Sequence, residues 1–497
     1  MESARRARRA PIAPSQSNGD ESRYSSWMAC YSKGLPHDEQ GLVVPKAYQA
    51  LIDAVRSRRP EDFAAIPIGS EHMPLVNPQG GLCLGLVGLD ACQFDMPPAP
   101  AFDSAERAGE QIECHWMSLA RDIPFSEYAT HPLIRAACDE LSALSDFRGP
   151  KQGGSVTPAT VFRGSMVGDL AGPYVSQFLL QPIKLGAMPV GQQISTYLPI
   201  SLGGNDYLAD FGSWLSVQNG DMPMGEIRRD PVYRYIRAAR DLCAYVHTDY
   251  TYQAFFNASV WLANHKTPVN RGSPYPINRS NQMGFATFGV PDAQGMMALA
   301  HLCALRAVWY QKWMVHRTLR PEEFGGRVHV TLTGAADYPV HEELKRSIAL
   351  ARTFERTRSY LLHQAYPEGC PQHPSYAQGH AACAGACVTV LKSFYDGSTR
   401  LLQLGDVYDA SPDGRTLVPY RSPQAGQLTI AGELDKLAGN IGIGRNFAGI
   451  HWRSDYLQGL LLGESVAIDL LREYSQTYSE AKVQRIIQKF DGREIVL

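Results

Sequence analysis

Apolar residues recur at three- and four-residue spacing in several long stretches from residue 104 onward. That period places them on one face of an α-helix, so each stretch is predicted to be helical. The third stretch contains Pro321 and the pair Gly325 and Gly326, which we expect to end its helix. The four longest stretches are 104–123, 230–265, 292–326 and 464–490.

Strand-like runs are few and short, at 326–334, 426–430 and 493–497. The expected fold class is therefore mainly α, with minor short strands. The chain begins with a basic segment rich in Pro, Ser and Gly, and residues 60–105 show little periodicity. We divide the chain into a disordered tail (1–25), an irregular and helical covering region (26–160), a helical core (161–480) and a C-terminal extension (481–497).

Composition excludes several classes of function. The 497 residues are 44% hydrophobic and 19% charged with a net charge of −2, so no field of one sign indicates nucleic acid or an anionic membrane as partner. No apolar run reaches the about 18 residues of a membrane span, and no apolar segment follows the basic start as a secretory signal requires. We expect a cytoplasmic enzyme, whose ten scattered cysteines are buried, reduced thiols.

The first candidate constellation is "KWMVHRTLRPEEFGG" (312–326). Lys312, His316 and Arg320 are spaced i, i+4 and i+8, so on a continuous helix they would lie along one face. A cationic strip facing solvent is one interpretation. The neighbouring Trp309 and Trp313 favour burial, and buried cationic side chains require an anion.

The second constellation is "HPSYAQGHAACAGACV" (373–388). Pro374 and Gly379 frame a turn, and small residues follow as in a tightly packed helix. A helix that begins at Gly379 to His380 directs its free backbone N–H groups and its positive dipole end at the loop. The segment alone is compatible with an anion-binding loop that presents His380 and with a turn before a core histidine.

The third constellation is "NIGIGRNFAGIHWRSDYLQGLLLGE" (440–464). Arg445 precedes His451 by six residues, and Asp455 follows His451 at i+4, where its carboxylate can accept the ring N–H and fix the tautomer. A single His and Asp pair is a weak signal. The signal is stronger because three segments supply cations or histidines on an apolar background.

Together these segments resemble the vanadium-dependent haloperoxidases and, more distantly, the related acid phosphatases. Stretches 168–183 and 206–220 are also similar to the branch that holds algal bromoperoxidases and bacterial enzymes of Streptomyces meroterpenoid pathways. The resemblance covers roughly residues 160–475 and implies a helical fold with two four-helix bundles and a homodimer or larger assembly. The family pattern K-x7-R-P, P-S-x-x-S-G-H and S-R-x5-H-x3-D is matched by Lys312, Arg320 and Pro321; by Pro374, Ser375, Gly379 and His380; and by Arg445, His451 and Asp455.

The resemblance also implies roles for these residues. Lys312, Arg320 and Arg445 would hold the equatorial oxygens of vanadate, which agrees with the preference of guanidinium forks and an ammonium group for a tetrahedral oxyanion. His451 would bond to the metal, and His380 would be the acid/base that activates peroxide. Around them, His373 matches a second family histidine, and Ser375 and Asp455 belong to the surrounding shell.

Two positions depart from the family pattern: Gly444 stands before Arg445 where a serine is usual, a position that also varies among algal-type members, and Gln378 departs in the second motif. Gln378 stands where the family has the serine whose hydroxyl bonds to vanadate. A glutamine amide that points inward would occupy part of the oxyanion volume and compete for the cations. We therefore expect a vanadate- and halide-independent isomerase that rearranges an α-hydroxyketone by a 1,2 shift, as a napyradiomycin-pathway relative does. The alternative is a vanadium-dependent chloro- or bromoperoxidase that uses hydrogen peroxide and halide to halogenate a prenylated aromatic substrate.

The isomerase hypothesis predicts a small prenylated naphthoquinone as substrate. His380 or His451 would remove the proton of its tertiary alcohol, while the three cations stabilise negative charge on the acceptor carbonyl oxygen. No cofactor is required, although phosphate or vanadate would fit the same oxyanion site, to which Gln378 and Gly379 also belong. The haloperoxidase alternative requires vanadate on His451.

Overall fold

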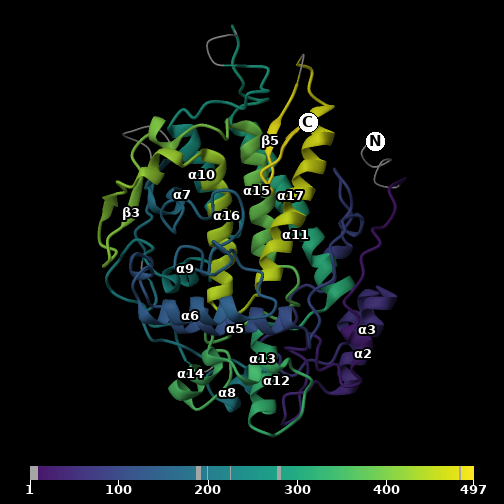
Figure 1. Cartoon of the computed structure of the whole chain (residues 1–497). Coiled ribbons are helices and arrows are strands. Elements are labelled where there is room, and N and C mark those ends of the chain that lie inside the picture. Colours follow the sequence, from purple (N-terminus) through teal and green to yellow (C-terminus); the bar gives the residue numbers. More distant parts are fainter. Residues whose placement is uncertain (1–8, 186–191, 199, 224, 277–280, 481–482) are drawn as a thin grey trace.

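The computed structural model describes residues 9–185, 192–198, 200–223, 225–276, 281–480 and 483–497. Long helices run through its centre, and α5 and α6 cross beneath them (Figure 1). Helix α15 packs against α11, α16 and α17. These six helices are α5 (Ala105–Ala120), α6 (Pro132–Ala143), α11 (Val290–Tyr310), α15 (Gly379–Phe394), α16 (Ile430–Phe447) and α17 (Arg453–Ser475).

Helices α15 and α17 approach so closely that two glycines have no room for a side chain. A Cβ on Gly385 would lie 2.2 Å from the carbonyl oxygen of Leu460, and one on Gly463 would lie 2.0 Å from that of Ala382. Every residue of α15 except His380 is buried. The predicted helix of small residues is therefore the central packing element, and its packing fixes the position of its N-terminus.

Shorter elements cover this centre. Strands pair antiparallel, and the described residues contain three two-stranded sheets: β1 (Ile183–Leu185) with β2 (Gln192–Ile194), β3 (Tyr408–Ala410) with β4 (Leu417–Pro419), and β5 (Ile486–Gln488) with β6 (Glu494–Val496). The shorter helices are α2 (Asp20–Arg23), α3 (Pro45–Ser57), α4 (Pro60–Ala64), α7 (Gln177–Leu180), α8 (Phe211–Gln218), α9 (Ala239–Tyr245), α10 (Gln253–Asn264), α12 (Pro321–Leu332), α13 (Glu342–Lys345) and α14 (Ile348–Thr357). Short 3-10 turns lie at Gly80–Leu82, Ala91–Gln93, Phe125–Glu127, Leu401–Gln403 and Pro423–Gln427, and a π-helical turn at Gln311–His316.

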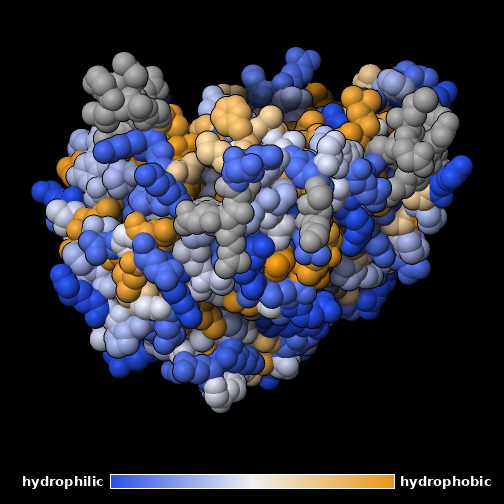
Figure 2. All heavy atoms as spheres, turned by 90° about the horizontal axis from the view of Figure 1, so that it is seen from above, coloured by the Kyte–Doolittle hydropathy of each residue, from blue (hydrophilic) through white to orange (hydrophobic). Residues whose placement is uncertain are grey.

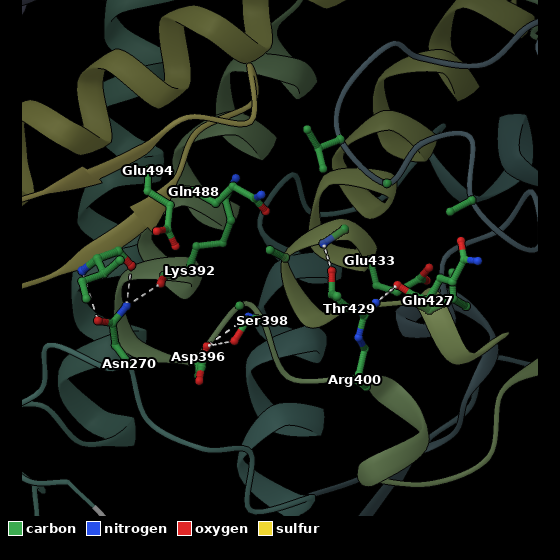
Figure 3. A pocket seen from close by; sticks show the side chains of 18 of the residues that line it. Asn270, Lys392, Asp396, Ser398, Arg400, Gln427, Thr429, Glu433, Gln488 and Glu494 are labelled. Carbon is green, nitrogen blue, oxygen red and sulfur yellow. Dashed lines mark hydrogen bonds between the residues drawn. The ribbon is translucent and has the colours of Figure 1, made fainter. Parts of the chain in front are cut away.

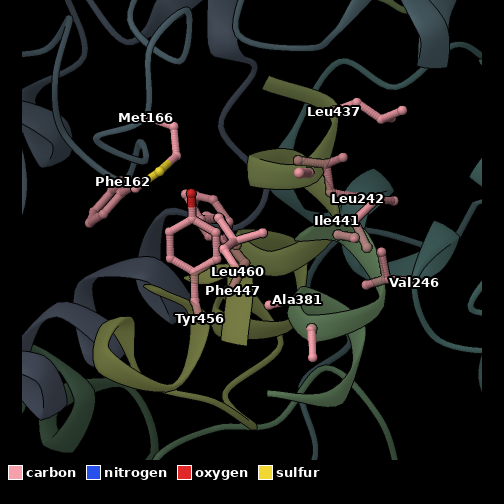
Figure 4. Packing of buried hydrophobic residues seen from close by; sticks show 14 of the residues in the cluster. Phe162, Met166, Leu242, Val246, Ala381, Leu437, Ile441, Phe447, Tyr456 and Leu460 are labelled. Atoms are coloured by element: carbon pink, nitrogen blue, oxygen red, sulfur yellow. The ribbon is translucent and has the colours of Figure 1, made fainter. Parts of the chain in front are cut away.

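A large hydrophobic core joins the central helices to the covering region, which contributes Phe102, Ile112 and Trp116. Tyr456 and Leu460 of α17 lie in this core with Ile441 of α16, Ala381 of α15 and Phe162, which follows the covering region (Figure 4). Burial of each large apolar side chain stabilises the fold by about 1.5–3 kcal/mol. This core holds the ends of α15, α16 and α17 in place.

The outer surface carries interspersed polar and apolar side chains, as the view from above shows (Figure 2). Every helix in the described part of the chain is too short or too polar to cross a lipid bilayer. All ten cysteines are free, and most are buried, as expected of reduced thiols, while Cys83 is exposed.

The helical stretches are confirmed in part. Helix α5 matches 104–123, whereas 230–265 is split into α9 and α10 by a loop, and 464–490 ends as a helix at Ser475 and continues into β5. The predicted end at Pro321 is wrong. Proline takes the first position of α12, where its missing N–H has no helical partner to lose.

Two of the three predicted strands are wrong. Residues 326–334 lie mostly in α12, because burial of that helix outweighs the strand propensity of its Val and Thr residues. The run 426–430 leads from a 3-10 turn into α16, which Thr429 caps by accepting the N–H of Gly432. The run 493–497 contains β6, as predicted.

Candidate active site

The three sequence constellations meet at the N-terminus of α15. Lys312 comes from the π-helical turn after α11, and Arg320 directly precedes α12. Arg445 lies in the last turn of α16, and His451 lies in the loop before α17. Hydrogen bonds join the loop before α15 to a set of residues around it: Lys312, Arg320, His373, Ser375, Gln378, His451 and Asp455. Arg445 acts on His380 and His451 electrostatically.

The expected helical strip of Lys312, His316 and Arg320 does not form. The helix widens to a π-turn at Gln311–His316 and ends, and Arg317 takes a left-handed conformation with φ 42°. His316 packs instead against the ring of Tyr376, and neither of its ring nitrogens has a hydrogen-bond partner within the described residues. Lys312 and Arg320 therefore reach the loop from two different elements.

Lys312 is buried against the loop that precedes α15. Its ammonium group donates to the carbonyl oxygens of Pro374 and Ser375, both at 2.6 Å. Burial, together with the nearby Arg320 guanidinium, lowers the pKa of Lys312 well below its usual range. The loop backbone and the lysine thus hold each other at the start of α15.

Arg320 links two histidines. Its Nη1 donates to Nε2 of His451 at 2.8 Å, and its Nη2 donates to Nδ1 of His373 at 3.0 Å. Its Nε donates to the carbonyl oxygen of His373 at 3.0 Å. A guanidinium only donates, so Nε2 of His451 and one ring nitrogen of His373, whose Nε2 also lies 3.3 Å from Nη2, must be acceptors. Both imidazoles are therefore neutral in this arrangement.

The other ring nitrogen of His451 faces a carboxylate. Nδ1 lies 2.8 Å from Oδ2 of Asp455, and the Ser375 hydroxyl donates to the same carboxylate oxygen. Burial, Arg320 and Lys312 lower the pKa of His451 well below its usual range. Asp455 thus holds the proton on Nδ1 and leaves a lone pair on Nε2, the tautomer that a metal ligand or nucleophile needs.

Arg445 approaches from α16. It donates through Nη1 to the carbonyl oxygen of Val246, and its guanidinium carbon lies 5.7 Å from the centre of the Tyr366 ring. Its Nε is buried and has no hydrogen-bond partner within the described residues. Arg445 therefore keeps a free donor inside the protein.

No carboxylate forms a direct ion pair with these three cations in the described part of the chain, although Asp455 acts electrostatically on Lys312 and Arg320, and Asp249 on Arg445. Elsewhere in the protein, buried lysines pair with acids, as Lys33 does with Glu322 and Lys392 with Asp435, both at 2.8 Å. In the described part of the chain, no carboxylate lies within 4.0 Å of the charged nitrogens of Lys312, Arg320 or Arg445. Buried charges without a partner are costly, so this cluster indicates a site for an anion.

A polar pocket elsewhere in the protein differs from this site in how its charged side chains are paired. It has a volume of about 380 Å³ and lies at the opposite end of α15, about 20 Å away at 1.5 Å per residue (Figure 3). Lys392 and Glu433 line it, but each is already paired, Lys392 with Asp435 and Glu433 with Lys436. Its charges are balanced within the protein, unlike those beside His451.

Gln378 occupies the N-cap position of α15 but does not face the cations. Its Nε2 donates to the carbonyl oxygen of Gly442 in α16 at 3.0 Å, and no hydrogen bond joins it to Lys312, Arg320 or Arg445. A Cβ on Gly442 would lie only 3.1 Å from Oε1 of Gln378. The glycine therefore leaves the space that the glutamine side chain uses.

His380 has a partner that sequence reasoning missed. Its Nε2 lies 2.9 Å from Oδ1 of Asp249, and its side chain keeps 17% of its surface exposed. Burial and Arg445 lower the pKa of His380, whereas Asp249 raises it. Asp249 also lines an open cleft of about 230 Å³ with Leu198, Ile200, Tyr245 and Thr248. Solvent and small molecules therefore have a route toward His380.

Comparisons with known proteins agree with this geometry. A family model described as the VCPO second helical-bundle domain matches residues 294–480. The vanadium-dependent bromoperoxidase of Corallina pilulifera is 34% identical over 572 residues, covering 97% of this chain and 95% of that protein. The bromoperoxidase of Ascophyllum nodosum is 36% identical over 479 residues, covering 91% and 83%. The homohexameric structure of the second vanadate-dependent bromoperoxidase from Ascophyllum nodosum matches with a TM-score of 0.93 at 29% identity, covering 100% of this chain and 88% of that one.

Proposed function

The chain belongs to the vanadium-dependent haloperoxidase family, and we propose that it binds vanadate beside His451 and oxidises bromide with hydrogen peroxide. The observation that carries this proposal is the convergence of three buried cations without a carboxylate partner on a neutral histidine. The curated relatives are named as bromoperoxidases, which supports bromide as the halide.

The residues present fit vanadate as an oxyanion. His451 carries its lone pair on Nε2, to which Arg320 donates in this structure and which vanadate would take in place of that hydrogen bond. Arg445 has a free buried Nε–H, and Lys312 and Arg320 add positive charge. The first turn of α15 adds backbone N–H groups without helical partners and the positive end of the helix dipole. When bound, vanadate would supply the Lewis-acid centre that makes hydrogen peroxide an oxidant of halide.

Gln378 does not obstruct this site in the observed arrangement. The amide donates to the carbonyl oxygen of Gly442, so it does not compete with an oxyanion for the three cations. The hydroxyl of the family's serine is nevertheless missing. The cost of the replacement is one lost donor to the oxyanion. A single hydrogen bond to a charged group contributes about 1.5–3 kcal/mol, which weakens binding without abolishing it.

His380 is placed to move protons in this reaction. The overall change, H₂O₂ + Br⁻ + H⁺ → HOBr + H₂O, consumes one proton and transfers two electrons from bromide to peroxide. His380 sits at the N-terminus of α15 with Asp249 on its Nε2, which leaves Nδ1 for the reacting oxygens. Asp249 borders the cleft, so protons and organic acceptors can reach this histidine from solvent.

A direct assay tests the proposal. The purified protein is incubated with vanadate, hydrogen peroxide and bromide, and bromination of an added β-diketone is followed by absorbance. We expect turnover that requires all three components. No turnover at any vanadate concentration would contradict the proposal.

A second candidate function is the α-hydroxyketone rearrangement, and the absent hydroxyl at position 378 favours it. A base, His380 or His451, would remove the alcohol proton, and the migrating carbon would break its bond to the carbinol carbon as it bonds to the carbonyl carbon. The former carbonyl oxygen takes up the proton, so no redox partner is needed. Incubation with a prenylated naphthoquinone hydroxyketone, without vanadate or peroxide, tests this candidate. Isomerisation insensitive to chelators and catalase would support it, and unchanged substrate would exclude it.

A further inference from the structure

The short segment 246–249 after α9 contacts the site at both of its ends. The carbonyl oxygen of Val246 accepts a hydrogen bond from Arg445, and the carboxylate of Asp249 bonds to Nε2 of His380 at 2.9 Å. The segment therefore positions one cation of the oxyanion site and the acid/base histidine together. Whatever holds this segment controls both contacts.

Between these two contacts, the side chain of His247 is held in place by two interactions. Its imidazole stacks on the ring of Tyr366, with ring centres 3.8 Å apart and an angle of 11° between the planes. Its Nε2 hydrogen-bonds to the carboxylate of Glu368. Thr248, the next residue, is exposed and lines the open cleft.

The surface on which His247 rests is itself fixed. The Tyr366 hydroxyl donates to the carbonyl oxygen of Cys243 at 2.7 Å, and the same ring lies 5.7 Å from the guanidinium carbon of Arg445. Lys33, buried and paired with Glu322, donates to the carbonyl oxygen of Glu368 at 2.7 Å. Tyr366 and Glu368 thus form a rigid support that contacts both His247 and Arg445.

We propose that His247 is a positioning residue for the oxyanion site, which fixes segment 246–249 on Tyr366 and Glu368 and thereby orients Arg445 and the Asp249–His380 pair. This inference rests on the proposed vanadate site. Without the imidazole, the Val246 carbonyl and the Asp249 carboxylate would both be free to shift. Loss of His247 would therefore weaken oxyanion binding and slow proton transfer, although it contacts no reacting atom.

The test compares His247→Ala with His265→Ala. His265 also stacks on an aromatic ring, that of Trp261, with centres 3.7 Å apart, but it lies at the end of α10 outside the site. The dissociation constants of orthovanadate and inorganic phosphate are measured by calorimetry, and bromide oxidation is measured at saturating vanadate. We expect His247→Ala to weaken vanadate binding and lower kcat by about tenfold each, whereas His265→Ala matches the wild type.

Two further variants separate positioning from folding. His247→Gln keeps a planar group that can bond to Glu368 and is expected to restore part of the vanadate affinity. Glu368→Ala leaves the stack but removes the carboxylate, and it is expected to weaken vanadate binding less than His247→Ala does. The positioning role would be overturned if both His247→Ala and Glu368→Ala had a vanadate affinity and a kcat within about twofold of those of His265→Ala. The proposed function would still stand in that case. A wild-type protein that binds neither oxyanion would overturn both.

Discussion

The side-chain nitrogen of Gln378 lies 3.0 Å from the carbonyl oxygen of Gly442. This contact turns the glutamine toward α16, between residues that are themselves buried, and away from hydrogen bonding with the three cations of the site. The replacement of the family serine by Gln378 is therefore a lost donor and not a blocked site.

Two variants of Gln378 distinguish a lost donor from a blocked site. Gln378→Ala removes the side chain without adding a donor, and its vanadate dissociation constant should stay within about threefold of the wild type, since no hydrogen bond to the oxyanion site is lost. Gln378→Ser adds a hydroxyl at the N-cap and should bind vanadate about tenfold more tightly. Calorimetric titration measures both. A tenfold gain in Gln378→Ala would show that the glutamine obstructs the site.

Asp249 is predicted to set the pH range in which His380 works. Burial and Arg445 hold the pKa of His380 below its usual value, and the Asp249 carboxylate opposes them by favouring the imidazolium form. Asp249→Asn removes this opposition, so the pKa of His380 should fall further and the acid limb of the bromide-oxidation profile should move to lower pH. The rate at neutral pH should fall about tenfold. The pH dependence of kcat/KM checks this, with Asp230→Asn, which alters a pair with Arg234 outside the site, as the control. An unmoved acid limb in Asp249→Asn would contradict the assignment.

Oxyanion binding should stabilise the fold, because the ligand compensates buried positive charge. At a concentration of 100 times the dissociation constant, a ligand that binds only the folded state adds about 2.7 kcal/mol to the free energy of unfolding. We expect vanadate and, less strongly, phosphate to raise the Tm of the wild type. Arg445→Met should lose most of this rise, whereas Lys392→Met, which breaks a buried pair with Asp435 elsewhere, should lower the starting Tm but keep the rise. An equal rise in Arg445→Met would place the bound anion at another site.

His316 is predicted to make stability depend on pH. Burial lowers its pKa to about 3, and neither ring nitrogen has a partner in the described part of the chain. Between that value and the unfolded pKa of about 6.5, only the unfolded chain binds the proton, so the free energy of unfolding falls as the pH falls through this window. His316→Phe should therefore gain about 2 kcal/mol more at pH 5 than at pH 8. Urea unfolding at both pH values measures the difference, and an equal gain at the two would contradict it.

The motif residues could be found from sequence because their spacing is fixed by local structure. His451 and Asp455 meet across one turn at the start of α17, and His380 follows the predicted start of α15. Asp249 could not be found this way. It lies 131 positions from His380, and only packing of the loop after α9 brings the two together. The direction of the Gln378 side chain could not be predicted from sequence either, because it depends on the space left by Gly442, 64 positions away.

In the fold, too, features set by local sequence were predictable and features set by distant packing were not. Helical periodicity identified α5, much of α11 and the C-terminal half of α17. The pattern gave no sign of the π-turn after α11, so Lys312 and Arg320 were expected on one face of one helix. Pro321 illustrates the limit, because proline is compatible both with the end of one helix and with the first turn of the next.

Bromide oxidation by the wild-type protein, measured with hydrogen peroxide over a range of added vanadate, is the most direct test of the proposed function. We expect a rate that is zero without vanadate and rises to saturation as one vanadate binds per chain. No vanadate-dependent rate, together with rearrangement of an α-hydroxyketone by the same sample, would contradict it.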